Sequence, residues 1–173
     1  MATTYLAFLR AVNVGKRKVP MAQLKSCLTD LGLSGVRTYL ASGNVFFESD
    51  EAPNAADIEA CLKSEFGFEI PVILRTLQEI DEIINASPFE GHERDERSRF
   101  LITLAKGPIS DDDLQERADC KIALRRQCEI ASVIYLRDGQ WPGKGAVRDG
   151  RNRPVSTSRF YHTLIKIANA ARP

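Results

Sequence analysis

The residues best suited to chemistry in this sequence lie in two short segments rich in cations and amides. They are Arg10, Asn13, Lys16, Arg17, Ser42, Gly43 and Asn44. Together they offer two carboxamides, a hydroxyl and several cations, but no carboxylate and no histidine. Arginine, lysine and backbone N–H groups bind phosphate or carboxylate through charge-assisted hydrogen bonds. The set therefore predicts a site for a small anionic ligand, with no metal ion and no cofactor.

Asn13 and Asn44 also have a simpler interpretation. Asparagine is common in turns because its side chain bonds to nearby backbone groups, and exposed cations ordinarily face water. On this interpretation both segments serve the fold alone. Titrating Arg10→Ala and Asn44→Ala variants with anions would separate the two interpretations.

Catalytic groups are scarcer. His162 lies near the C-terminus beside Tyr161, and His92 lies in an acidic segment with Glu90 and Glu93. Neither histidine adjoins a serine or cysteine in a nucleophile motif, and no cluster has the spacing of metal ligands. An enzyme of unidentified reaction class, using His162 or the linker carboxylates, is therefore the alternative to a binding protein.

A predicted β-hairpin carries the second segment. Val36–Leu40 and Val45–Glu48 are rich in β-forming residues and flank a Ser-Gly-Asn break. The turn needs a residue at positive φ, which Gly43 or Asn44 adopts at low cost. The apolar and aromatic run Thr3–Arg10 is predicted to be a central strand.

Two helices and a fourth strand complete the first half. Apolar residues recur at helical spacing over residues 20–32 and again over residues 58–67. Ile70–Arg75 is a short strand, and Pro71 places it at an edge or marks its start. The resulting β-α-β-β-α-β order is ferredoxin-like. In that arrangement the loop after the first strand, the hairpin turn and the loop before the fourth strand lie at one end of the sheet, which brings the two candidate segments together.

The second half is predicted to repeat part of this order. Thr76 and Glu79 form a capping box for a third helix, and residues 87–98 form a polar linker. Strands follow at residues 99–105, 122–124 and 130–137, with a helix from Ser110 and a turn at Arg125-Arg126-Gln127. Residues 138–154 form a long loop, and Thr157 or Ser158 caps a final helix.

The sequence thus predicts an α+β protein in three parts. Residues 1–86 form a ferredoxin-like βαββαβ half with an appended helix, and residues 87–98 form the linker. Residues 99–173 form a partial βαββα half that lacks a final strand or borrows one, and that packs against the first half.

Composition and cysteine content are those of an ordinary soluble protein. Of the 173 residues, 43% are hydrophobic and 27% charged. No apolar run approaches the roughly 20 residues of a membrane helix, and the N-terminus lacks the features of a signal peptide. A cytoplasmic location is therefore expected, with free thiols at Cys27, Cys61, Cys120 and Cys128. Cys27 and Cys61 lie on apolar helix faces, where burial is expected.

Charge is balanced overall but unevenly distributed. Residues 76–119 hold 12 acidic and 5 basic side chains, whereas residues 141–173 hold 1 acidic and 7 basic side chains. Such runs are usually solvated faces. Binding to nucleic acid needs a basic stripe on one face, and the sequence shows only a basic segment, so a nucleic-acid partner is weakly supported. Self-association through an exposed edge strand is a third alternative.

Four stretches carry a family resemblance. Phe8–Gly15, Val19–Leu24, Tyr39–Val45, and Phe66-Gly67-Phe68 with Pro71-Val72 resemble, in order and approximate spacing, the bacterial family named domain of unknown function sixteen ninety-seven. Near its C-terminus that family has a Thr-Arg-Asn-aromatic-Asn-Thr run. Residues 157–163 keep the arginine, an aromatic residue and the threonine, but lack both asparagines. The resemblance implies a compact α+β protein and carries no established activity.

Overall fold

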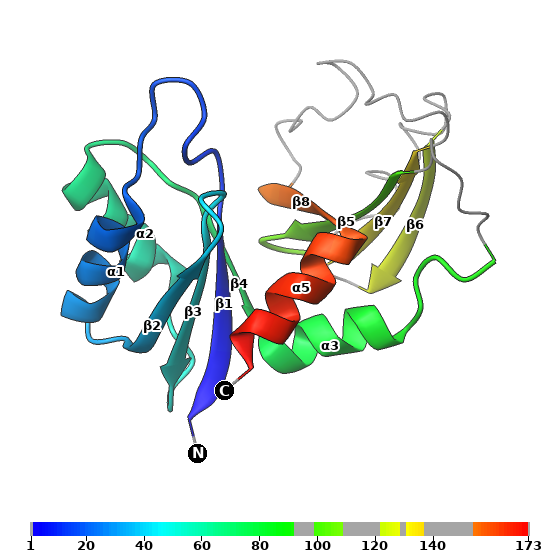
Figure 1. Cartoon of the computed structure of the whole chain (residues 1–173), viewed down its shortest axis with the longest axis horizontal. Helices are drawn as coiled ribbons and strands as arrows, with labels where there is room; N and C mark the ends of the chain where they lie inside the picture. Colours follow the sequence, from blue (N-terminus) through cyan, green and yellow to red (C-terminus); the bar gives the residue numbers. More distant parts are fainter. Residues whose placement is uncertain (1, 92–98, 109–121, 129–130, 137–153, 173) are drawn as a thin grey trace. The chain divides into compact units, whose positions relative to one another are not determined.

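The computed structural model contains two units, each built on a four-stranded antiparallel sheet (Figure 1). It describes residues 2–91, 99–108, 122–128, 131–136 and 154–172. Contacts between Cα atoms assign Met1–Ile80 and Ile167–Pro173 to the first unit and Asp81–Lys166 to the second. The chain is a mixed α/β protein, and its described part contains four helices.

The first sheet contains β1 (Thr3–Leu9), β2 (Ser34–Tyr39), β3 (Asn44–Ser49) and β4 (Val72–Thr76) in the order β2-β3-β1-β4. All neighbouring strands are antiparallel. β1 is central, as its apolar composition predicts, because Phe8 pairs with Asn44 on one side and with Ile73 on the other. β4 lies at an edge directly after Pro71. An edge position tolerates a proline because no ladder hydrogen bond is lost there.

Two helices, α1 (Met21–Asp30) and α2 (Ala55–Phe66), lie on the same side of this sheet (Figure 1). Leu24, Cys27 and Leu28 are buried on α1, and Ile58 and Leu62 are buried on α2, which confirms both apolar stripes. They pack with alternate residues of β1, β3 and β4 in one apolar core. Burying one apolar face of each helix on the sheet is what drives this arrangement.

Both ends of α2 carry local stabilising signals, of which only the one at Gly67 was predicted. The Asn54 side chain accepts a hydrogen bond from the backbone N–H of Ala56 at 3.0 Å, which satisfies one orphan donor of the first turn. Gly67 ends the helix in the left-handed conformation, with φ 76°. A glycine adopts this conformation without steric cost.

The C-terminal turn of α5 (Tyr161–Ala171) belongs to the first unit. The Arg37 guanidinium on β2 donates hydrogen bonds to the carbonyls of Ala170 (3.1 Å) and Ala171 (3.0 Å). It also lies over the Phe46 ring, 5.6 Å from the centroid. A cation that binds the last carbonyls of a helix stabilises its negative end. Arg37 therefore anchors the chain's C-terminal turn to β2 and β3.

The third helix, α3 (Leu77–Asn85), has the predicted capping box. The Thr76 backbone N–H donates to Glu79 Oε2 at 2.7 Å, and the Glu79 backbone N–H donates to Thr76 Oγ1 at 3.1 Å. This reciprocal pair satisfies two donors that the helix start would otherwise leave without partners.

The second sheet contains β5 (Arg99–Ala105), β6 (Ile122–Cys128), β7 (Ala131–Leu136) and β8 (Ser156–Phe160) in the order β6-β7-β5-β8. Again all neighbours are antiparallel. Two predictions are wrong here. The second half does have a final strand, β8, and this strand contains Thr157 and Ser158, so neither caps the final helix, which begins at Tyr161. Arg125-Arg126-Gln127 belongs to β6 rather than to a turn.

Both errors have a physical cause. β8 is short and mostly polar, and it is held in the sheet by pairing with β5, where the Thr103 and Ser158 hydroxyls are 2.9 Å apart. The polar run in β6 stays extended because it pairs with β7 up to a register shift between Arg126 and Cys128. Pairing partners distant in sequence leave no local signal.

Three aromatic rings pack together in the second unit. The Phe89 ring lies 4.6 Å from the Phe100 ring and 5.1 Å from the Tyr161 ring. Tyr161 Oη donates to the carbonyl of Ile84 at 3.1 Å, and burial raises the pKa of Tyr161. These contacts join α3, β5 and the start of α5 within this unit.

Several predictions fall outside the described residues. They concern residues 92–98 of the linker, the helix from Ser110, the loop at 138–153, His92 and Cys120. Cys27 and Cys61 carry free thiols, as predicted. Cys27 is buried as expected, whereas Cys61 is half-buried. None of the helices in the described part of the chain has the length and apolar composition needed to cross a membrane.

Candidate functional site

Three loops meet at one end of the first sheet, and we call this region the loop end. They are the β1–α1 loop (residues 10–20), the β2–β3 turn (residues 40–43) and the α2–β4 loop (residues 67–71). The Leu9 N–H donates to the carbonyl of Gly43 at 2.8 Å, and the Arg10 N–H donates to the carbonyl of Pro71 at 2.9 Å. The two segments that carry the seven candidate residues therefore lie close together at this end of the sheet.

Asn13 ties the β1–α1 loop to the hairpin turn. Its Nδ2 donates to the carbonyl of Ala41 at 2.7 Å and to the carbonyl of Val19 at 3.2 Å. Its Oδ1 accepts a hydrogen bond from the Val19 N–H at 2.8 Å. The Asn13 amide thus both donates and accepts hydrogen bonds, and it holds the loop in position.

Asn44 has a similar role inside the hairpin. It is 1% exposed, and its Nδ2 donates to the carbonyl of Tyr39 at 2.9 Å and to Ser42 Oγ at 3.0 Å. A buried amide is stable only when its polar atoms have partners. The turn needs left-handed residues at Gly43 (φ 80°) and, unexpectedly, at Leu40 (φ 59°). Asn44 itself is the first residue of β3.

Gly43 fits where no larger residue does. A Cβ built on it would lie 2.5 Å from Val12 Cγ2 and 2.9 Å from Leu9 Cβ. Real Cβ atoms essentially never come that close to another heavy atom. The hairpin turn and the β1–α1 loop thus approach each other so closely that a glycine is required between them.

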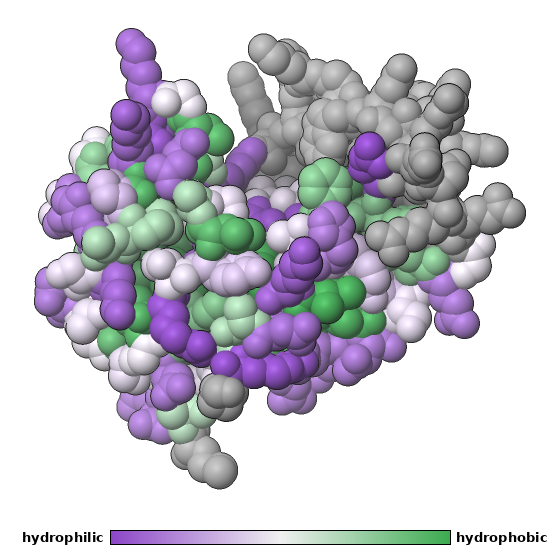
Figure 2. Space-filling model, viewed as in Figure 1, coloured by the Kyte–Doolittle hydropathy of each residue, from purple (hydrophilic) through white to green (hydrophobic). Residues whose placement is uncertain are grey.

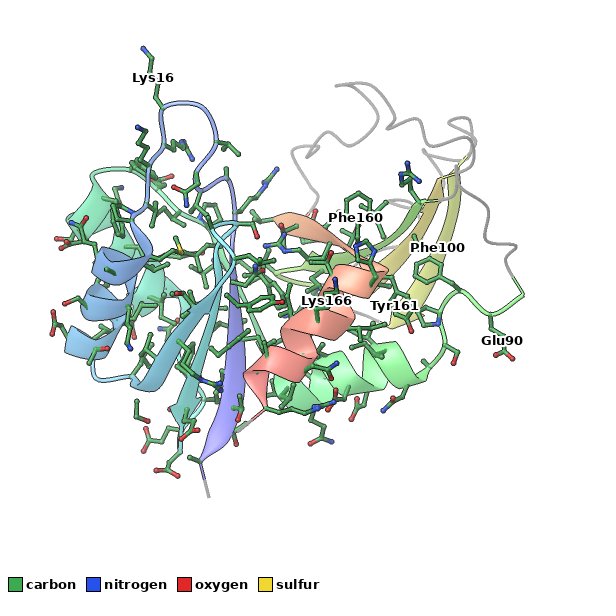
Figure 3. The ribbon with its side chains drawn as sticks, viewed as in Figure 1. Lys16, Glu90, Phe100, Phe160, Tyr161 and Lys166 are labelled. Carbon is green, nitrogen blue, oxygen red and sulfur yellow. The ribbon has the colours of Figure 1, made fainter. Side chains whose placement is uncertain are left out.

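The cations lie on the outer part of the β1–α1 loop. Val14 to Arg17 forms a tight turn in which the Arg17 N–H donates to the carbonyl of Val14 at 3.2 Å. Lys16, Arg17 and Lys18 are exposed, and Arg10 is half-buried. Figure 3 shows Lys16 projecting from the tip of the loop, away from the ribbon. Hydrophilic side chains gather at this tip in the space-filling view (Figure 2).

Arg17 links this loop to the α2–β4 loop. Its guanidinium lies over the Phe68 ring, 5.3 Å from the centroid, and its Nη1 donates to the carbonyl of Glu69 at 3.4 Å. The Glu69 carboxylate is directed elsewhere, since its Oε1 is 3.1 Å from Lys63 Nζ. Within the described residues, neither Lys16 nor Lys18 forms an ion pair.

The catalytic candidates are not assembled into a site in the described part of the chain. His162 is exposed, and its ring stacks on Phe160 with centroids 5.7 Å apart. Glu90 is exposed, and the other acidic side chains of the predicted linker lie outside the described residues. No group of three or more His, Cys, Asp or Glu residues suited to a metal ion occurs among the residues described. The enzyme alternative therefore stays a prediction.

The comparisons with known proteins agree with the sequence resemblance. Residues 2–135 match DUF1697, a family described as protein of unknown function. The chain belongs to this family. The matched residues of this DUF1697 protein include the whole loop end, whereas β8 and α5 follow the match.

A solved structure is also similar to this DUF1697 protein. It is that of the conserved bacterial protein SP0830 from Streptococcus pneumoniae, with a TM-score of 0.73 and 22% identity over 100% of both chains. At this identity the likeness shows the fold alone. No curated protein matches the chain significantly. Neither the family nor the structural neighbour carries an activity that transfers to the chain, so its function is argued from the site.

Sequence reasoning missed two contacts in the first unit of this DUF1697 protein. One is the bond of Arg37 to the end of α5, which joins residues 133 positions apart. The other is the contact of Cys27 with Cys61, both of which the apolar stripes had placed on the core side of their helices. Only the contact of Cys27 with Cys61 had a signal in the sequence. Two helices that pack their apolar stripes on one sheet bring the residues in the middle of those stripes close together.

Proposed function

We propose that the loop end binds a small anionic ligand that carries a phosphate or carboxylate group. The observation that supports this best is that Lys16, Arg17 and Lys18 are exposed on one loop that the hydrogen bonds of Asn13 anchor. Cations held in place by the fold lose less conformational freedom when a ligand binds than cations on a mobile loop. An anchored basic loop is therefore suited to capture an anion.

The start of α1 supports the same proposal. The helix begins after Pro20 without a side-chain cap, and its first turn contains no acidic residue. The first N–H groups of a helix have no intrahelical partner and favour negative charge. The basic loop runs directly into this helix. The free N–H groups of the helix and the cations of the loop therefore act on the same side of the ligand.

The seven candidate residues divide into two roles under this proposal. Lys16 and Arg17 contact the anion, together with Arg10 from the end of β1. Asn13, Ser42, Gly43 and Asn44 hold the loops in position through the hydrogen bonds and the close approach described above. A small anion is preferred over nucleic acid because the cations are confined to one loop and form no extended stripe.

Titration with inorganic phosphate and sulfate at low salt tests the proposal. Lys16→Ala and Arg17→Ala should each weaken phosphate binding by about tenfold, since a charge-assisted hydrogen bond contributes at least about 1.5 kcal/mol. Lys25→Ala is the matched control, because Lys25 is also exposed but lies on α1 beyond the loop. The proposal is wrong if the unsubstituted protein binds neither anion, or if the loop variants bind as tightly as the control. Much tighter binding of an oligonucleotide would favour the nucleic-acid alternative instead.

We also infer that each sheet with its helices is a ferredoxin-like half of a cytoplasmic protein. The orders β2-β3-β1-β4 and β6-β7-β5-β8 support this, because each places the first strand of its unit between the third and the fourth. The division into residues 1–86, a linker at 87–98 and residues 99–173 remains our proposal. Contacts between Cα atoms support two units but divide the chain after Ile80. Limited proteolysis should cut first within residues 87–98, and a first cut elsewhere would contradict the proposed linker.

A further inference from the structure

Cys27 on α1 and Cys61 on α2 bring two thiols into direct contact. Their Sγ atoms are 2.6 Å apart, and the Cys61 thiol also donates to the carbonyl of Cys27 at 3.5 Å. A disulfide needs about 2.05 Å between its sulfur atoms, so bond formation requires an approach of about 0.5 Å.

The two helices are fixed against the sheet on both sides of this pair. Leu24 and Leu28 flank Cys27 on α1 and are fully buried, and Ile58 and Leu62 flank Cys61 on α2 and are 1% and 0% exposed. The contact is therefore a property of the packed core and not of a surface loop. Close packing of this kind holds the two sulfur atoms at one separation.

We propose that Cys27 and Cys61 form a reversible disulfide that joins α1 to α2 when the protein meets a low-molecular-weight disulfide such as oxidised glutathione. The inference concerns the helix pair and is independent of the anion site. In a reducing compartment the two thiols stay free, as they are in the structure.

The reaction has two exchange steps, and the difference in exposure sets their order. Cys61 is half-buried, whereas Cys27 is 7% exposed, so a glutathione disulfide reaches Cys61 first. The Cys61 thiolate attacks one glutathione sulfur, a mixed disulfide forms, and one glutathione thiolate leaves. The Cys27 thiol then loses its proton to water, and its thiolate attacks Cys61 Sγ and displaces the second glutathione. Two protein thiols are oxidised by two electrons while one glutathione disulfide is reduced to two thiols.

The second step should be the slower one. Burial, which is the largest cause, raises the pKa of Cys27, and the charges of Glu65 and Asp30 raise it further; these causes persist when Cys61 is in the mixed disulfide. Little Cys27 thiolate is therefore present at neutral pH, and the thiolate is the attacking species. The mixed disulfide at Cys61 should accumulate before the cross-link closes.

The first experiment uses a Cys120→Ser/Cys128→Ser variant, in which Cys27 and Cys61 are the only thiols. In a buffer of oxidised glutathione its two free thiols should disappear, and its mass should fall by two hydrogens with no rise in oligomeric state. Dithiothreitol should restore both thiols. Because the cross-link closes a loop of 34 positions, the oxidised form should melt roughly 5–15 °C above the reduced form. Peptide mapping of the unsubstituted protein should give the same cross-linked pair, which keeps the test valid if the variant folds poorly.

Single serine substitutions in the same background test the order of attack. Cys27→Ser should trap one glutathione on Cys61, whereas Cys61→Ser should leave Cys27 largely unmodified. The proposal is overturned if both thiols persist in the oxidised buffer, if the disulfide forms between chains, or if mapping finds Cys27 paired with another residue. Equal modification of the two single variants would overturn the proposed order.

Discussion

Replacing Gly43 with alanine tests most directly how tightly the loop end is built. Gly43 has φ 80°, and a Cβ there would lie 2.5 Å from Val12 Cγ2, 2.9 Å from Leu9 Cβ and 3.2 Å from the carbonyl oxygen of Leu9. Val12 and Leu9 are themselves 4% and 1% exposed, so they have little room to move. The Leu9 N–H also donates to the Gly43 carbonyl, so any shift that relieves the clash strains this bond.

Two terms give the size of the effect. A left-handed conformation costs a residue with a Cβ about 1–2 kcal/mol. Forcing a methyl group into a well-packed core costs about 1–3 kcal/mol more. Gly43→Ala should therefore lower the free energy of unfolding by about 2–5 kcal/mol.

Gly15→Ala is the matched control. Gly15 also has a positive φ, 58°, but a Cβ there would meet nothing within 4 Å. The Gly15→Ala variant should therefore lose only the cost of the left-handed conformation, about 1–2 kcal/mol of the free energy of unfolding. Urea unfolding followed by far-UV circular dichroism measures both variants against the parent. Equal losses for the two variants would show that the hairpin turn and the β1–α1 loop are less closely packed than the geometry indicates.

Three further predictions concern single side chains. Asn13→Ala should lower the free energy of unfolding by about 1–3 kcal/mol, because it removes the three side-chain hydrogen bonds that anchor the β1–α1 loop. Asn169→Ala on α5 is the control, because Asn169 is also exposed, and an equal effect there would contradict the reasoning. Thr76→Ala should cost about 1 kcal/mol through loss of the capping box, and a Glu79→Ala change in the same protein should then add little, which a double-mutant cycle in urea measures. Because burial raises the pKa of Cys27 from 9.0 to about 12, the unfolded chain releases this proton at lower pH than the native chain, so the free energy of unfolding should fall as pH rises from 9 to 12. Cys27→Ser should flatten this slope, and an unchanged slope would show that the thiol is not protected.

The elements predicted correctly from the sequence are those with signals inside a few residues. Apolar spacing along α1 gives its buried face, and Pro20 and Gly32 mark its limits. The Thr76–Glu79 pair predicts the start of α3 because both partners lie in one turn. Such signals depend on helix geometry alone and need no knowledge of the rest of the fold.

β8 was missed because its strand character comes from its partner. Ser156–Phe160 contains one large apolar residue, Phe160, and that residue is 42% exposed. Its polar side chains are half-buried between neighbours: Arg159 donates to Thr157 Oγ1 at 2.8 Å, and its burial lowers the pKa of the guanidinium. A polar run beside a predicted helix resembles a cap, and only pairing with β5 makes it a strand.

The position of the three loops was predicted from the sequence, but their contacts were not. Strand order alone puts the three loops at one end of the sheet, and the structure has them there. Which side chains hold the loops and which stay exposed depends on contacts between distant residues. Asn13 and Ala41, for example, are 28 positions apart. A sequence shows which side chains are able to bond, whereas the approach of two loops decides which of them do.

Backbone strain in the β1–α1 loop is a further observation that supports the proposed anion site. Ala11 has φ 56°, a conformation that costs a non-glycine residue about 1–2 kcal/mol. A connection between a strand and a helix does not need such a residue, and strained backbone persists only where its surroundings enforce it. Here the enforcing contacts are the buried side chains of Val12 and Val19 and the hydrogen bonds of Asn13. These contacts keep Lys16 and Arg17 on a defined loop, so an anion that binds there need not order the loop first.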